Sequence, residues 1–388
     1  MNETTQAPFL HEEKKTLSAV VISVAAITSA YVYFLIFAGF GFVNLARSVV
    51  GKGGMPLVLS FLGVGGIAGC VLAARMFSQG RGQGQLTKGF AGCLIAALLA
   101  LFVRVEAIVV VTALLVGLST AWTAVSLSLC LRPTLHFKEL GKWCGLGTGL
   151  AYALCNQPFI FEGTLNGKII TGTVAAGIGL LASFRMRSTQ LRPSSLPDYE
   201  FQAATGWVVA LFALVFLDTL VFFIIQNSAV VKQLSWETPL ILQGNAFVHL
   251  CAAFVTGLAL DQRRPGTFAL IALLLLVASC IVLRLHIEHF PKARMLYIAA
   301  VSIYSTVLIY LPARGSRPAF TATLYGISGW LATGLSLSIA FATDARQVPA
   351  YVIILALLVG TAGLFTRLLS VRRSQEMESE RLIQRKPA

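Results

Sequence analysis

One acidic residue, Asp218, lies near the middle of an apolar run, residues 205–227, that is long enough to cross a membrane as one helix. A carboxyl group at that depth costs several kcal/mol unless it is protonated, paired or in contact with water. The other acidic residues fall in the tails, in the connections or at the ends of apolar runs. Asp218 is therefore the first candidate for a functional group, and a structural hydrogen bond to a neighbouring helix is the alternative.

Other spacings of reactive residue types offer less chemistry. His286 and His289 are three residues apart and could share a metal on a helix, but no third ligand accompanies them. Gly145, Gly147 and Gly149 are spaced as in a nucleotide-binding loop, but no strand precedes them and no phosphate-binding lysine follows, so they indicate close helix packing. The seven cysteines have no paired spacing, which is typical of small buried hydrophobic residues. We therefore expect no metal site, no cofactor and no enzyme active site, because a nucleophile, base and orienting group do not occur together.

The elements that position Asp218 follow from composition. Of 388 residues, 56% are hydrophobic and 12% are charged, whereas a soluble protein has about a quarter charged. We predict an all-α polytopic membrane protein with twelve transmembrane helices, the first of them retained because its apolar run is too long for a signal-peptide core. The runs are residues 18–45, 55–75, 88–104, 107–131, 143–161, 168–185, 205–227, 238–260, 266–284, 295–312, 319–342 and 348–371.

A polar stretch with two prolines, residues 185–201, divides these runs into two sets of six. Two helical halves with a substrate site between them are a common transporter plan. The predicted domains are an N-terminal tail, a first six-helix bundle, a linker, a second six-helix bundle and a C-terminal tail: residues 1–17, 18–185, 186–204, 205–371 and 372–388.

The formal charge of +14 raises the question of a nucleic-acid partner. If both termini are cytoplasmic, 21 of the 30 Lys and Arg residues fall in cytoplasmic segments and 9 on the other side. This asymmetry is the positive-inside rule, so the charge reports orientation and not nucleic-acid binding. We expect a monomeric, multi-pass protein of the cell (inner) membrane with both termini in the cytoplasm, whose partners are the lipid bilayer and a small-molecule substrate.

The segment after the eighth run, residues 257–266, reads G-L-A-L-D-Q-R-R-P-G. It resembles the cytoplasmic loop motif of the major facilitator superfamily. The resemblance implies twelve helices in two six-helix halves with cytoplasmic termini. It also implies a conformational latch in which Asp261 is a helix-end charge and Arg263 or Arg264 is its partner.

The equivalent loop of the first half departs from that pattern. Gly69, Arg75 and Arg81 are present, but no Asp lies between them. A standard charge latch is therefore not expected in the first half.

The resemblance further implies that the first, fourth, seventh and tenth helices line a central cavity, with contributions from the fifth, eighth and eleventh. The polar residues of these helices become the candidate substrate-binding residues: Tyr33, Trp122, Thr123, Asn156, Asp218, Asn245, His249 and Tyr304. Aromatic faces with a few hydrogen-bonding groups and one acid suit a small organic ligand that is neutral or cationic.

Asp218 and His249 are the candidate proton-coupling pair, since imidazole titrates near neutrality. Alternatively, these two side chains pair permanently and only hold their helices together.

The function that these features favour is secondary active transport of a small neutral or cationic organic molecule by proton-coupled alternating access. Asp218 would be the coupling site or the anchor for a cationic ligand. Two alternatives remain. A protein of this fold can act without transport, as a membrane assembly factor or a pigment- or cofactor-delivery factor. An integral membrane enzyme would need catalytic residues that meet at one membrane interface.

Overall fold

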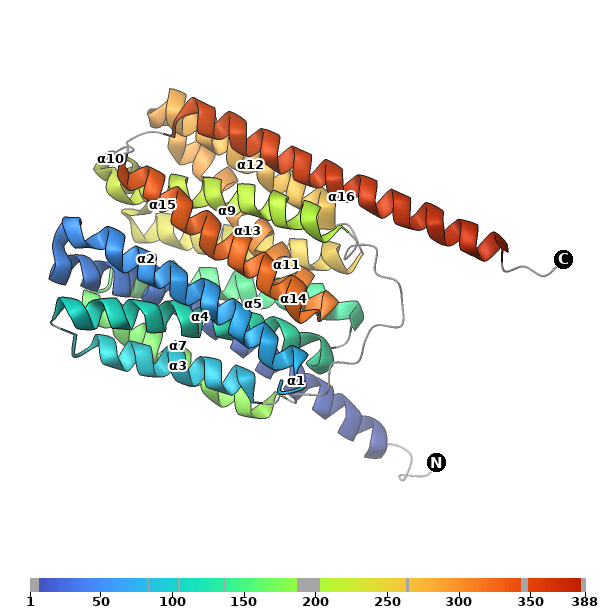
Figure 1. Cartoon of the computed structure of the whole chain (residues 1–388). Coiled ribbons are helices and arrows are strands. Elements are labelled where there is room, and N and C mark those ends of the chain that lie inside the picture. Colours follow the sequence, from blue (N-terminus) through green and yellow to red (C-terminus); the bar gives the residue numbers. More distant parts are fainter. Residues whose placement is uncertain are drawn as a thin grey trace.

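Helices are the expected result of these apolar runs, because backbone N–H and C=O groups inside a bilayer have no water to bind and must pair within their own segment. The computed structural model describes residues 7–82, 84–103, 105–135, 137–186, 203–262, 265–342 and 348–384. Figure 1 shows long, roughly aligned helices along the described chain.

The N-terminal half, residues 7–185, contains six α-helices of two turns or more and three short or irregular helical elements. They are α1 (Ala7–Val32), η2 (Tyr33–Phe42), α2 (Val43–Ser78), α3 (Gln85–Ala100), α4 (Glu106–Thr134), η3 (Phe137–Glu139), α5 (Leu140–Cys155), α6 (Pro158–Phe161) and α7 (Leu165–Arg185).

The C-terminal half, residues 204–384, continues in the same way. Its elements are α9 (Ala204–Asn227), α10 (Ala229–Trp236), α11 (Pro239–Asp261), α12 (Pro265–Leu285), η4 (Ile287–His289), α13 (Phe290–Gly315), α14 (Pro318–Thr323), η5 (Leu324–Leu331), α15 (Ala332–Ala342) and α16 (Ala350–Gln384).

Eight helical stretches of the described chain are long and apolar enough to cross a membrane. One of them, Leu17–Ser78, counts as two crossings because the chain reverses at Gly51, which has a φ of 65° that favours glycine. Three shorter or broken segments complete the twelve predicted crossings: α3, α5 and the series α14, η5 and α15. The connection between the first two crossings, expected to span residues 45–55, is therefore shorter than predicted, because α2 is helical on both sides of Gly51.

Two crossings contain a π-helical stretch, η2 in the first and η5 in the eleventh. Such stretches widen the helix locally and occur often at functional sites. Another interruption follows α5, where Asn156 and Gln157 separate it from α6. Pro158 begins α6 because a residue without an N–H is tolerated in the first turn of a helix.

The two halves lie side by side, and both ends of the chain lie at the same end of the molecule (Figure 1). We call this end the terminal end and the other the distal end, where α10 lies. Contacts between the halves join α5 with α11, α2 with α14 and η5, and α4 and α5 with α13. The predicted linker, residues 186–204, lies mostly outside the described residues.

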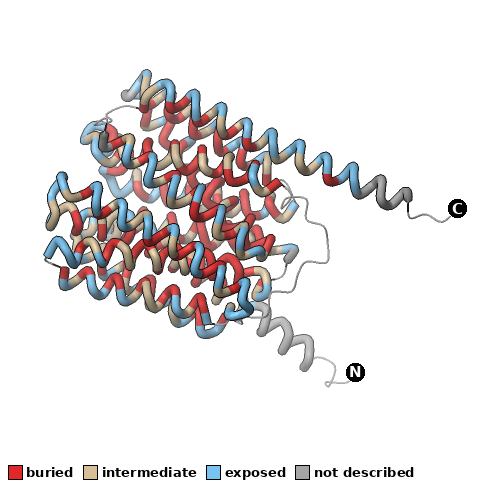
Figure 2. Tube along the Cα trace, in the orientation of Figure 1, coloured by how far each residue is buried: buried red, intermediate tan, exposed pale blue. Residues whose placement is uncertain are grey.

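Buried residues face the interior and exposed residues follow the outer surface of the helices (Figure 2). The outer surface carries large apolar side chains, among them Phe102, Phe159 and Leu181, each more than two thirds exposed. Apolar groups on the outside are expected where the surrounding solvent is lipid. The largest fully buried side chain, Trp207, lies in the core of the C-terminal half.

Candidate functional site

A cavity of about 540 Å³ lies between the two halves, within the usual size range of small-molecule sites. Its wall comes from α1, η2, α2, α3, α4, α5, α6 and α7 on one side and from α9, α10, α11, α13, η5 and α15 on the other. Its wall extends to the distal end, where the exposed Lys232 of α10 is part of it. The first, fourth, seventh and tenth crossings all contribute, as the sequence resemblance implies.

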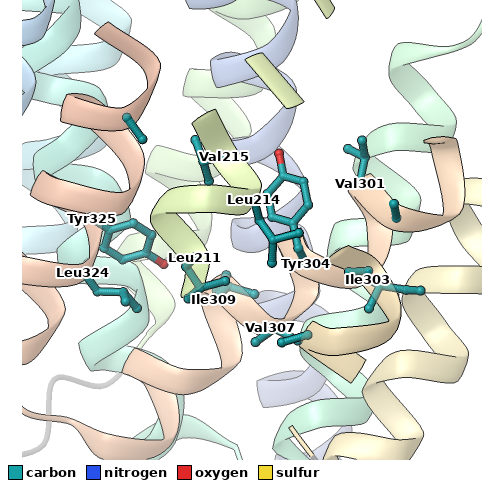
Figure 3. Close-up of a cluster of buried hydrophobic side chains, with 14 of the residues drawn as sticks. Leu211, Leu214, Val215, Val301, Ile303, Tyr304, Val307, Ile309, Leu324 and Tyr325 are labelled. Carbon is teal, nitrogen blue, oxygen red and sulfur yellow. The ribbon is translucent and has the colours of Figure 1, made fainter. Parts of the chain in front are cut away.

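Asp218 of α9 lines this cavity and is held by two tyrosines of α13. The Tyr297 hydroxyl donates a hydrogen bond of 2.6 Å to Oδ1, and the Tyr304 hydroxyl donates to Oδ2. Each carboxylate oxygen therefore has one charge-assisted bond and can accept another. Figure 3 shows Tyr304 beside Leu214, within the packed apolar cluster formed by α9 and α13. Asp218 is only half-buried because one side of it faces the cavity.

His249 of α11 lies on the cavity wall but has different partners from Asp218. Its ring stacks on Tyr152 of α5, with centroids 4.5 Å apart and an angle of 12° between the planes. Its Nδ1 lies 2.7 Å from the hydroxyl oxygen of Ser302 on α13. The alternative of a permanent pair between Asp218 and His249 is not what the geometry shows, since each is held by other groups.

Hydrogen bonds between the halves close the cavity toward the terminal end. The Tyr31 hydroxyl donates to the backbone oxygen of Ser305 at 2.9 Å, and the Tyr152 hydroxyl lies 2.9 Å from the Ser305 hydroxyl. Farther along, the hydroxyls of Ser128 and Tyr325 are 2.8 Å apart. These contacts join α1, α4 and α5 to α13 and η5, so the described halves meet on this side of the cavity.

Asp261, a residue of the predicted latch, forms a contact between the halves at the terminal end. Its carboxylate accepts hydrogen bonds from the backbone N–H groups of Gly141 at 2.7 Å and Lys142 at 2.8 Å, in the first turn of α5. This geometry places a negative charge at a helix N-terminus, where unpaired N–H groups and the helix dipole favour it. Its expected partners, Arg263 and Arg264, lie outside the described residues.

Six of the eight predicted substrate-binding residues line the cavity, and two do not. The six are Tyr33, Thr123, Asn156, Asp218, His249 and Tyr304. Trp122 packs against the hydrophobic core instead, since successive residues of a helix point about 100° apart and Thr123 faces the cavity. Asn245 is fully buried, and its side-chain amide donates to the backbone oxygen of Ser235 at 3.1 Å. The expectation that these two contact a ligand in the cavity does not fit this arrangement.

Several residues of the wall are not among the predicted substrate-binding residues. Tyr297 lies seven residues before Tyr304, two helical turns away on the same face, and this spacing is a signal that could have identified it. Arg47, Lys168 and Lys232 also line the cavity. They lie at the ends of apolar runs, where Lys and Arg ordinarily extend to the membrane interface.

The sequence analysis considered His286 and His289 as metal ligands and expected no metal site there. Their rings are 5.6 Å apart, and the imidazole of His286 lies 3.4 Å from the Glu288 carboxylate at an exposed position. Among the described residues, no three His, Cys, Asp or Glu side chains are grouped as metal ligands.

The fold was compared with those of known proteins. No family model matches the chain, and no curated protein sequence matches it. Solved structures do match over nearly the whole length. The human organic anion transporter MFSD10 (TETRAN) is 13% identical with a TM-score of 0.64, covering 92% of this chain and 99% of that protein. The proton:xylose symporter XylE, of the major facilitator superfamily, is 10% identical with a TM-score of 0.68, covering 92% of this chain and 96% of that protein.

The chain therefore has the major facilitator superfamily fold and is an all-helical, multi-pass integral membrane protein. This confirms the fold that the resemblance implies and the twelve-helix fold class that the sequence predicts. At these identities the comparison establishes the fold and leaves the substrate to be argued from the cavity.

Proposed function

We propose that this protein is a secondary active transporter that moves a small organic molecule by alternating access, with Asp218 as its proton-coupling site. One observation carries the proposal: the halves enclose a cavity with a single acid in its described wall, and hydrogen bonds join the halves between this cavity and the terminal end. The two structural neighbours give support, because one is described as an organic anion transporter and the other as a proton:xylose symporter.

Alternating access requires that the contacts of the terminal end separate while the distal end closes. The groups to separate are the Ser128–Tyr325 pair and the Asp261 contact with α5. The distal end already has a contact between the halves that can develop further, since the rings of Phe40 and Phe222 lie 5.3 Å apart, edge to face. The moving bodies would be the predicted bundles, residues 18–185 and 205–371.

The coupling step follows from hydrogen-bond chemistry. As a carboxylate, Asp218 accepts from both Tyr297 and Tyr304, whereas a protonated carboxyl gains a donor and becomes a weaker acceptor. Protonation therefore loosens a tyrosine hydroxyl, which becomes available to a ligand in the cavity. The His249 imidazole, also on the wall, is a second candidate for proton transfer, since its Nδ1 lies 2.7 Å from the hydroxyl oxygen of Ser302.

The orientation comes from the charge asymmetry of the sequence. With 21 of the 30 Lys and Arg residues expected at the terminal end, the positive-inside rule favours a cytoplasmic terminal end, and the cell membrane stays the location expected from the sequence. The cavity then extends toward the non-cytoplasmic side.

The test begins with a ligand. A thermal-shift screen of the purified protein against a metabolite library identifies it, because a ligand that binds the folded state raises Tm. Uptake of that compound into proteoliposomes with an imposed pH gradient is then compared for the wild type, Asp218→Asn and Asp218→Glu.

We expect Asp218→Asn to lose proton-driven accumulation while keeping exchange of ligand across the membrane, and Asp218→Glu to keep both in part. Undiminished accumulation by Asp218→Asn would remove the carboxyl from the coupling mechanism. An absence of exchange in the wild type, together with co-purification of a stable partner, would favour an assembly or delivery role.

A further inference from the structure

Three cationic side chains line the distal part of the cavity: Arg47 of α2, Lys168 of α7 and Lys232 of α10. Arg47 and Lys168 are half-buried and Lys232 is exposed. Lys168 and Lys232 come from opposite halves and line the same cavity. No acidic side chain in the described part of the chain forms an ion pair with any of the three.

The charge of the described wall is therefore positive. Asp218 is the one acid among the described lining residues, and two tyrosine hydroxyls already bind it. Two acids near the distal end, Glu162 and Glu237, are exposed and do not line the cavity. A cleft lined by one sign of charge between apolar walls concentrates the opposite ion. An anion between Lys168 and Lys232 would be attracted by both charges.

The three cations also lie on the side of the membrane where few Lys and Arg residues of this chain are expected. Only 9 of the 30 Lys and Arg residues are expected on the non-cytoplasmic side, and three of those nine line this cavity. Extension to the membrane interface accounts for a cation at the end of a helix but not for three that line one cavity, and a bound anion would account for that arrangement.

Aromatic rings also line the cavity, and one of them lies beside Lys168. The Lys168 ammonium lies 5.7 Å from the centre of the Phe40 ring, which contacts Phe222 of the other half. Phe161 stacks on Trp236 across the halves, with centroids 6.4 Å apart. Flat apolar surfaces of this kind bind rings by offset or edge contact.

The cavity wall also holds a hydrogen-bond donor without a partner. Gln226 lines the cavity, and its side-chain amide nitrogen is buried without an acceptor among the described residues. A buried donor without a partner is costly, and an oxygen of a bound anion would satisfy it.

We infer that the substrate is an organic anion with a flat ring, whose negative group binds between Arg47, Lys168 and Lys232 while its ring packs on the aromatic side chains of the distal end. The inference rests on the proposed transport function and specifies its substrate class. It replaces the neutral or cationic ligand expected from the sequence, which was argued from Asp218 and the aromatic residues without these three cations.

Three probes with the same ring system test the charge preference: 2-naphthoate, 2-naphthamide and 2-naphthylmethylammonium. Their affinities for the purified full-length protein are measured by tryptophan fluorescence and by thermal shift. We expect 2-naphthoate to bind at least about tenfold more tightly than the other two, with an affinity that falls as salt is added. Equal affinity for the three, preference for the ammonium probe or no binding of naphthoate at millimolar concentration would overturn the inference.

Variants then locate the site. The double variant Lys168→Gln/Lys232→Gln is expected to weaken naphthoate binding about tenfold and to reduce its salt dependence. Lys168→Arg/Lys232→Arg, which keeps both charges, should retain most of the affinity. Lys52→Gln removes an exposed lysine of the distal end that does not line the cavity, and it should change nothing. An unchanged naphthoate affinity in the doubly neutralised variant would place the anion elsewhere.

Binding and transport are measured separately, so the two proposals fail in different ways. Naphthoate that binds but is never moved by the wild type in proteoliposomes would support the anion site and contradict the transporter. Uptake of the amide or ammonium probe with no preference for the anion would support transport and contradict the anion site.

Discussion

The carboxylate of Asp261 at the end of α11 accepts a hydrogen bond of 2.7 Å from the backbone N–H of Gly141 in the first turn of α5. This contact crosses between the halves and uses a charge in one half to satisfy a helix end in the other. Because the acceptor is ionised, the bond is among the stronger ones available at this end of the molecule.

Replacement of Asp261 with alanine should therefore open the terminal end. Loss of hydrogen bonds to a charged group costs about 1.5–3 kcal/mol each, enough to shift a two-state equilibrium by roughly tenfold or more. Spin labels on Ser78→Cys and Arg372→Cys, at exposed positions of the two halves, should report longer distances in a cysteine-free background. Glu106→Ala is the matched control, since it removes an exposed acid from the first turn of α4. Unchanged distances in Asp261→Ala would mean that this contact does not hold the halves together.

The two tyrosines that bind Asp218 should be energetically coupled to it. Tyr304→Phe removes one donor to the carboxylate and should lower stability by about 1.5–3 kcal/mol, because a charged acceptor loses its partner. In an Asp218→Asn background the same substitution should cost much less, and the difference is the coupling energy of a double-mutant cycle. Thermal unfolding in detergent measures it. Tyr351→Phe, at a largely exposed position, is the control. Equal costs in both backgrounds would show that the hydroxyl acts independently of the carboxyl.

The sequence predicted how deep a polar side chain lies along its helix, but it did not predict which side of the helix carries it. Asp218 is evident because an acid inside an apolar run needs an explanation, and Tyr304 lies at a similar depth. Thr123 and Trp122 are neighbours at one depth, but only Thr123 lines the cavity. The hydrophobic pattern does not separate them, because a helix in a membrane is apolar on both its lipid-facing and its protein-facing sides.

The cations of the cavity were not predicted as ligand-binding residues, for a related reason. Lys168 and Arg47 lie near the ends of apolar runs, where the ordinary role of such a side chain is to reach the membrane interface. Only the packing of α7 and α2 beside the cavity distinguishes a lining residue from an interface anchor. The partner of Asp261 could not be predicted either, because it is the backbone of a helix more than a hundred residues away. Every residue type other than proline has a backbone N–H, so the sequence does not mark which one binds the carboxylate.

Close packing between the halves at α5 and α11 should be sensitive to side-chain size. A Cβ added at Gly145 would lie 2.4 Å from the backbone oxygen of Ala253, a contact that real Cβ atoms do not make. Gly145→Leu should therefore push α5 away from α11, lower Tm and lengthen the label distance at the terminal end. Overpacking of this kind typically costs about 1–3 kcal/mol. Gly177→Ala is the control, because nothing lies within 4 Å of its added Cβ and the helix gains propensity. Normal Tm and unchanged distances for Gly145→Leu would show that the two helices do not need this close approach.

The positive field of the cavity can be measured without a substrate. Asn227 is exposed and lines the distal part of the cavity near Lys232, so Asn227→Cys in a cysteine-free background places a thiol in that field. A negatively charged methanethiosulfonate reagent should react with it faster, relative to a positively charged one, than with the exposed control Val230→Cys, which does not line the cavity. We expect the ratio of the two rates to differ between the positions by about tenfold and to fall at high salt. Neutralisation by Lys168→Gln/Lys232→Gln should bring the ratio at Asn227→Cys down to that of the control. The same ratio at both positions before neutralisation would mean that the three cations create no usable attraction for an anion, and the substrate would then have to be recognised by Asp218 and the aromatic rings alone.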